Sequence, residues 1–173
     1  MTRLVLLAAV AIGALPLAGP GTAEKGCSAP SHHQFDFWIG DWDAYDMAAP
    51  DSIVARNHVT PMLDSCALRE VYEQNDGLRG ESFSAWDESR GLWHQSWVTN
   101  GGTVLLLDGG MRGDSMVLTA TEHHPDGTTS LLRGTWWPEG SAVREKADRS
   151  RDGGATWTPV FDIVFRPHRP APH

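Results

Sequence analysis

Basic residues are scarce in this sequence. Lysine and arginine together number 14 against 22 aspartates and glutamates, so the net charge is -8. The basic residues are also scattered along the chain and form no cluster. A protein that binds nucleic acid needs a basic stripe on one face. The composition therefore argues against nucleic acid as a partner.

Apolar runs long enough to span a membrane are missing as well. The run from Leu4 to Leu17 is shorter than the roughly 20 residues that a spanning helix requires, and Gly13 and Pro16 interrupt it. Arg3 precedes the run and small residues up to Ala23 follow it, which is the pattern of a secretory signal peptide. The alternative is an uncleaved membrane anchor. We expect cleavage of residues 1–23 and a secreted or periplasmic protein that has no membrane partner after cleavage.

Cysteine is limited to Cys27 and Cys66. Export would carry both into an oxidising compartment, where pairing is the usual outcome. The alternative, a reactive thiol, has little support because neither residue belongs to a Cys-x-x-Cys motif. We therefore predict a Cys27–Cys66 disulfide that closes a loop of about forty residues, worth roughly 4 kcal/mol on the chain-entropy model.

Short motifs of known enzyme chemistry are absent. The sequence contains no G-x-S-x-G nucleophile elbow and no phosphate-binding glycine loop. Its eight histidines include no His-x-His or His-x-x-x-His spacing, and adjacent histidines on a strand point to opposite faces. We therefore predict no metal site and no cofactor. Catalysis stays open, because a barrel interior can hold an acid–base pair drawn from distant strands.

Short runs of Val, Leu, Trp, Thr and Phe fill most of the remaining chain, separated at close intervals by Gly, Asp, Asn and Pro. This rhythm is typical of an all-β protein with tight turns. A meander of this length must close on itself to lose its edges. We predict a single antiparallel up-and-down β-barrel of about ten strands in residues 24–166. The predicted strands are 41–47, 52–62, 65–74, 78–87, 92–99, 103–108, 114–122, 128–137, 142–150 and 156–165.

Two segments fall outside the strand pattern. Residues 31–39 have Ser31 as a possible N-cap and apolar residues at helical spacing, which predicts one short N-terminal helix that closes one end of the barrel. Residues 167–173 contain three prolines and no apolar period. We predict that this tail is disordered.

The stretch FDFWIGDWD, residues 35–43, places Gly40-Asp41-Trp42 between the predicted helix and the first strand. In that setting the chain resembles the calycin superfamily, the lipocalins and fatty-acid-binding proteins. With WHQSW and SRDGGATW it also looks like a bacterial exported group of unknown function, related to the domain-of-unknown-function 1579 proteins. The resemblance implies that Trp42 plugs the closed end and that Arg166 lies across its ring. Nitrobindins are related haem-binding barrels, but Asp43-Ala44-Tyr45 departs from their pattern, so no haem is implied.

The segment SRDGGATW, residues 150–157, fits the Asp-box pattern S-x-D-x-G-x-T-W. Its expected role is structural: Asp152 caps backbone N–H groups of a hairpin turn, and Trp157 packs beneath it. A sialidase, in which the pattern also occurs, would need an arginine cluster and repeated blades, and the chain has neither.

The segment WHQSW is the strongest candidate for a binding surface. On a strand, Trp93, Gln95 and Trp97 share one face, so an amide lies between two indoles. That arrangement suits a small apolar or aromatic ligand with a polar end. Weaker candidates for the same site are Trp86, Trp136 and Arg144. The alternatives are a small enzyme with an interior acid–base pair, and a filled barrel that acts as a protein-interaction module.

Overall fold

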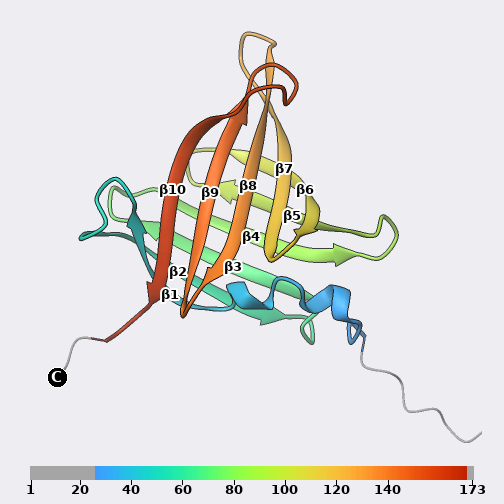
Figure 1. The fold of residues 1–173 in the computed structure, drawn as a ribbon, viewed down its shortest axis with the longest axis vertical. Helices are drawn as coiled ribbons and strands as arrows, with labels where there is room; N and C mark the ends of the chain where they lie inside the picture. Colours follow the sequence, from blue (N-terminus) through green and yellow to red (C-terminus); the bar gives the residue numbers. More distant parts are fainter. Residues whose placement is uncertain (1–25, 171–173) are drawn as a thin grey trace, which may run out of the picture.

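The structure is a computed structural model that describes residues 26–170. Within these residues, ten antiparallel strands form a closed barrel (Figure 1). The predicted fold class is therefore confirmed, whereas the predicted signal peptide lies outside the described residues. The strands are β1 (Gly40–Asp46), β2 (Ile53–Met62), β3 (Ala67–Gln74), β4 (Arg79–Asp87), β5 (Leu92–Thr99), β6 (Val104–Arg112), β7 (Ser115–His123), β8 (Thr129–Glu139), β9 (Ala142–Ser150) and β10 (Thr158–Pro167).

Each strand pairs with its neighbour in sequence, and β1 closes the barrel by pairing with β10. Trp42 lies opposite Asn57 of β2 on one side and opposite Pro167 of β10 on the other. Within residues 26–170, closure gives each of the ten strands two neighbours. The predicted strand bounds agree closely except for β6, which continues through the glycines at 109 and 110. The sequence reads as a turn there, but both residues pair with β7.

The helical segment lies across one end of the barrel, where Figure 1 shows it in blue. It consists of two consecutive 3-10 helices, η1 (Pro30–His33) and η2 (Asp36–Trp38). The expected N-cap role of Ser31 is wrong: Ala29 occupies that position without a side-chain cap. The reason is that Pro30 starts the helix, since its fixed φ suits the first turn. We call residues 30–39 the plug.

Three aromatic side chains anchor the plug in the barrel end. Phe35 is fully buried and meets the rings of Trp93 and Trp136 edge-on, with centroids 5.7 and 5.6 Å away. Trp38 is 4.5 Å from the ring of Phe165 and stacks on Trp42 at 6.3 Å. Trp42 Nε1 donates a hydrogen bond to the Trp38 carbonyl oxygen. The indole of Trp42 therefore joins the plug to β1.

The position of the Trp42 indole requires a glycine at residue 40. A Cβ atom on residue 40 would lie 2.3 Å from Trp42 Cζ2, which is far inside van der Waals contact. Only glycine lets the Trp42 ring fold back over the backbone at the start of β1. The G-x-W spacing is thus a packing requirement at the closed end.

Arg166 does not lie across Trp42, and that expectation from the family resemblance is wrong. Its guanidinium carbon is 4.2 Å from the ring centroid of Tyr45, and Nη1 donates to the Pro50 carbonyl oxygen. The physical reason is alternation along the strands. Trp42 is buried inside the barrel, whereas Arg166 and Tyr45 lie towards the outside.

The predicted disulfide is confirmed, with Cys27 and Cys66 joined and their Cα atoms 5.1 Å apart. The bond ties the segment before η1 to the turn between β2 and β3. The predicted disordered tail is wrong at its start: Pro167 ends β10, and His168 donates its backbone N–H to the Asp41 carbonyl oxygen. Residues 171–173 lie outside the described part of the chain. None of the helices in residues 26–170 has the length and apolar character needed to cross a membrane.

The hairpin between β9 and β10 is fixed by side-chain hydrogen bonds. The backbone N–H of Thr156 donates to Asp152 Oδ1, and Ser150 Oγ also donates to this carboxylate. Trp157 Nε1 donates to the Gly154 carbonyl oxygen, and the Arg133 guanidinium stacks on the Trp157 ring at 4.0 Å. Asp152 thus caps the turn and the indole covers it.

Candidate functional site

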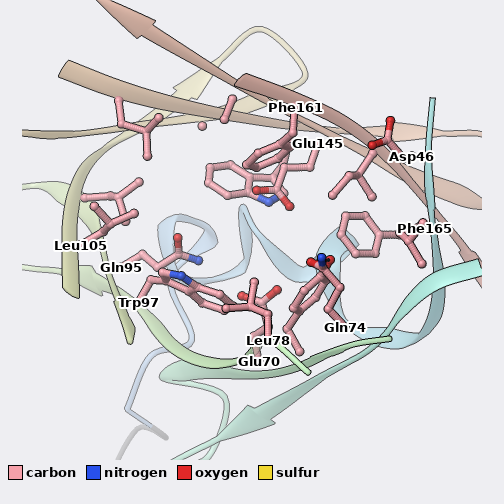
Figure 2. A pocket seen from close by; sticks show the side chains of 18 residues that line it. Asp46, Glu70, Gln74, Leu78, Gln95, Trp97, Leu105, Glu145, Phe161 and Phe165 are labelled. Carbon is pink, nitrogen blue, oxygen red and sulfur yellow. Dashed lines mark hydrogen bonds between the residues drawn. The ribbon is translucent and has the colours of Figure 1, made fainter. Parts of the chain in front are cut away.

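A cavity of about 400 Å³ occupies the barrel interior beyond the plug. It extends towards the opposite end, where Asp46 ends β1, Gln74 ends β3 and the exposed Leu78 directly precedes β4. Figure 2 shows the side chains that surround it. The lining residues are Asp46, Val54, Glu70, Tyr72, Gln74, Leu78, Gln95, Trp97, Leu105, Leu107, Leu132, Gly134, Trp136, Glu145, Ala147, Phe161, Ile163 and Phe165.

Most of the wall is apolar or aromatic. The indoles of Trp97 on β5 and Trp136 on β8 and the rings of Phe161 and Phe165 on β10 reach the cavity from three strands. Tyr72 packs against Trp97 with ring centroids 6.1 Å apart. Such walls suit a guest with a flat or branched apolar body, because rings offer large contact areas with little side-chain entropy to lose.

Glu70 brings a carboxyl group into this apolar space. It lies on β3 between Leu68 and Tyr72 on the inward face, and it is 8% exposed. Burial raises the pKa of Glu70 from 4.5 to about 7, because the charged form loses its hydration. Ser82 Oγ donates to Oε2 at 2.8 Å, and this hydrogen bond lowers the pKa in part. Asn57 acts in the same direction through weaker geometry.

Glu145 brings a second carboxyl group from β9. Burial raises its pKa well above 4.5, and the negative charge of Glu70 raises it further. The neighbouring Trp136 indole, opposite Glu145 in the β8–β9 register, lowers the pKa only in part. Figure 2 shows Glu70 and Glu145 pointing into the cavity from facing walls. Two acids in one apolar space with raised pKa values form a potential acid–base pair.

A hydrogen-bonded chain supports Glu70 from behind. Gln95 Nε2 donates to Ser84 Oγ at 3.0 Å and to Ser82 Oγ at 3.3 Å, and Ser82 in turn donates to Glu70. Because Gln95 uses its nitrogen here, its carbonyl oxygen is the acceptor that it can offer to the cavity. Asn57, beside Glu70 and 1% exposed, has no hydrogen-bond partner of normal geometry at Nδ2 or Oδ1. Behind the cavity wall, the Asn57 amide therefore has unused hydrogen-bonding capacity.

The structure brings three of the six predicted binding residues to the cavity: Gln95, Trp97 and Trp136. Trp93 shares their face but lies deeper, because β5 runs from the closed end and each pair of residues advances the chain by about 6.6 Å. It packs on Phe35 and donates Nε1 to Gln34 Oε1. Trp93 is therefore part of the closed end and does not line the cavity.

Trp86 and Arg144 also do not line the cavity. Trp86 lies opposite Trp93 and packs, half-buried, against the core. Arg144 is on the outer face of β9, because it alternates with Glu145. Its Nε and Nη2 atoms donate to the two carboxylate oxygens of Asp162 at 2.6 and 2.8 Å. Placing Arg144 in the site is therefore wrong.

Two of the cavity indoles depend on glycines. A Cβ atom on Gly80 would lie 2.2 Å from Trp97 Cζ2, and one on Gly134 would lie 2.3 Å from Trp136 Cη2. Each indole therefore lies flat on a neighbouring stretch of backbone. The glycines set how far the rings extend into the cavity.

Sequence reasoning missed Glu70, Glu145 and Tyr72. A signal for the first exists in ALREVYEQ, where Leu68, Glu70 and Tyr72 alternate on one face. A glutamate between two apolar residues at a spacing of two is a candidate for an inward position. The corresponding signal in AVREKADRS is weaker, because Glu145 is flanked on its face by the small Val143 and Ala147.

Within the described residues, no group of three or more His, Cys, Asp and Glu side chains is arranged to hold a metal ion. The chemistry that the site offers is hydrogen bonding, charge and aromatic contact. The closed ten-strand antiparallel barrel is compatible with a calycin-like fold. No family model and no curated protein matches this sequence.

Proposed function

We propose that this protein is exported and binds a small molecule with an apolar or aromatic body and one polar end inside its barrel. The observation that carries the proposal is the cavity of about 400 Å³ with aromatic walls and a polar end at Glu70, Glu145 and Gln95. This volume lies within the range of about 300–1,000 Å³ typical of small-molecule sites.

The disulfide supports the exported context. Stable disulfides belong mainly to oxidising compartments, and the Cys27–Cys66 bond follows directly after the proposed signal peptide. The proposed membership of the exported FDFWIGDWD group agrees with this placement. The cavity also speaks against the filled-barrel alternative, because a module that acts only through its surface has no need of interior space.

A fluorescence titration tests the proposal. A neutral probe such as N-phenyl-1-naphthylamine should bind at one saturable site and quench tryptophan emission, because Trp97 and Trp136 line the cavity. Gln95→Leu should change the relative affinities of apolar and polar probes more than it changes the free energy of unfolding. Ser96→Ala, on the outer face of the same strand, is the matched control. Absence of saturable binding would reject the proposal.

The facing carboxyl groups favour one second candidate, an enzyme that uses Glu70 and Glu145 as general acid and base. A pKa near 7 suits proton transfer at neutral pH. Incubation of the protein with the small molecules that co-purify from its own periplasm, followed by mass spectrometry, separates the two functions. An unchanged guest supports binding, and a new product that Glu70→Gln abolishes supports catalysis.

A further inference from the structure

We infer that the guest carries a basic nitrogen, held as an ammonium group between Glu70 and Glu145. This inference rests on the proposed binding function and names the class of ligand: amphipathic amines with an apolar or aromatic body. The argument starts from the charges that face the cavity.

The cavity wall is acidic and has no basic counterpart. Asp46, Glu70 and Glu145 line it, and none of its lining residues is a lysine, arginine or histidine. The basic residues nearest along β8 and β9 already have acidic partners. These ion pairs are Arg133–Asp148, Arg144–Asp162, Lys146–Asp162 and Arg149–Glu122.

Buried carboxylates without a counter-ion are unfavourable, because they lose hydration and gain no opposite charge. A guest ammonium group would supply that charge. A guest carboxylate would add a further negative charge to a space that already holds two acids. Charge complementarity therefore selects a cation over an anion.

The two glutamates face the same cavity space from different strands. Glu70 on β3 and Glu145 on β9 lie on facing walls and point into the space between them (Figure 2). The rings of Tyr72, Trp97 and Trp136 also line this space, and aromatic faces attract cations as well as apolar groups. Gln95 adds an amide whose carbonyl oxygen remains as an acceptor, because its nitrogen donates to Ser82 and Ser84. The carboxyl and amide oxygens can thus accept hydrogen bonds from an ammonium group, and the aromatic rings of the wall can contact both the cation and the apolar body.

The proposal predicts a coupling between binding and protonation. Below the pKa of about 7, Glu70 is neutral and attracts an ammonium group weakly; above it, the carboxylate is available. The pKa of Glu145 lies well above its usual value, so an incoming cation would also displace its proton. Of the other titratable lining groups, Asp46 lies at the mouth, and burial raises the pKa of Tyr72 so that it stays neutral. Affinity for an amine should therefore rise from pH 5 to pH 8.

Three probes of one shape test this: 1-naphthylmethylamine, 1-naphthylmethanol and 1-naphthoate. At pH 8 the amine should bind about tenfold more tightly than the alcohol, and the carboxylate should bind more weakly than both. At pH 5 the preference for the amine over the alcohol should shrink to about twofold or less. Calorimetry in buffers of different ionisation enthalpy should show proton release when the amine binds.

Double variants test whether Glu70 and Glu145 cause the preference for the amine. Glu70→Gln with Glu145→Gln should remove the preference for the amine and keep binding of the alcohol. The control, Glu73→Gln with Glu139→Gln, makes the same change in net charge at exposed side chains and should keep the preference.

The outcomes distinguish this inference from the proposed function. Equal saturable binding of amine and alcohol at pH 8 would overturn the inference and support the proposed function. A preference that survives in the Glu70/Glu145 variant would also overturn the inference, because long-range charge would then explain it. Failure of all three probes to bind at a saturable site would count against the proposed function itself.

Discussion

Individual side chains in the barrel interior serve either packing or chemistry. Phe35 and Trp38 are fully buried and fill the closed end, whereas Glu70 and Glu145 place carboxyl groups in an apolar space. A buried acid destabilises the folded state once it is ionised, because the unfolded chain hydrates the charge better. Such residues indicate a function, since packing alone would favour an apolar side chain at these positions.

The raised pKa of Glu70 makes stability depend on pH. Between 4.5 and about 7 the folded state holds a proton on Glu70 that the unfolded state has lost, so the contribution of Glu70 to the free energy of unfolding falls as pH rises through this window and is level above it. At 1.36 kcal/mol per pKa unit, Glu70 accounts for about 3 kcal/mol. Glu70→Gln should therefore stabilise the protein at pH 8 by about 3 kcal/mol more than at pH 4, measured by urea unfolding.

Glu73→Gln is the control, because this side chain is exposed on the same strand. It should leave the pH dependence of the wild type in place. An effect of Glu70→Gln that is the same at both pH values would contradict the raised pKa.

Substitution of Gly80 by alanine should change both stability and probe binding. In Gly80→Ala the new methyl group would overlap the Trp97 ring, and overpacking of this kind typically costs about 1–3 kcal/mol. The displaced indole should also change the affinity of the cavity for a neutral aromatic probe. Gly110→Ala is the matched control, since no atom lies within 4 Å of the position of its Cβ.

Unfolding and probe titrations should show both changes in Gly80→Ala and neither in Gly110→Ala. A Gly80→Ala protein with wild-type stability and probe affinity would mean that Trp97 is not held against the backbone of β4.

At the level of elements, the plug and the first strand act as one unit. The indoles of Trp38 and Trp42 stack, a hydrogen bond joins them, and Phe165 of β10 packs against the first. The two 3-10 helices are too short to be stable alone, so their conformation depends on the barrel that they close. The barrel end in turn depends on their aromatic side chains.

Trp42→Ala should therefore cost about 3–5 kcal/mol of unfolding free energy, as other large-to-small core changes do. Arg166→Ala should cost no more than about 1 kcal/mol, because the side chain is exposed and its contact is with Tyr45. Chemical denaturation of both variants gives the comparison. Equal losses would imply a contact between Arg166 and the core that the structure does not show.

At the level of the whole molecule, two closures hold the fold together. The pairing of β1 with β10 removes the edges of the sheet. The Cys27–Cys66 bond then ties the segment that precedes the plug to the turn between β2 and β3, across 39 residues of sequence. The second closure adds a covalent link between the start of the plug and the barrel.

Removal of the disulfide in Cys27→Ala with Cys66→Ala should lower stability by about 4 kcal/mol on the chain-entropy model. The measurement is urea unfolding of the variant against the wild type. Intact-mass analysis after alkylation should find no free thiol in the wild-type protein before reduction. Two alkylatable thiols in the native protein would contradict the bond.

The sequence by itself determined the strands, the turns and the disulfide. Strand bounds follow from local alternation and from turn residues that tolerate positive φ, as at Gly77 and Gly127. The disulfide follows because the chain has two cysteines and an export signal pattern. Gln95 and Trp97 were found in the same way, since their shared face depends only on the period of two.

Only the tertiary structure decided which face of each strand points into the barrel and which inward side chains line the same cavity. On β3 and β9 polar residues occur on both faces, so the pattern makes Glu70 only a candidate for an inward position and gives a weaker signal for Glu145. Their meeting depends on closure, which places β3 and β9 on facing walls although 75 positions separate the two residues. The tertiary structure also decides how far along the barrel each side chain lies. Trp93 contacts the plug and Trp97 lines the cavity, because long-range packing sets the position of the plug and no local sequence period encodes it.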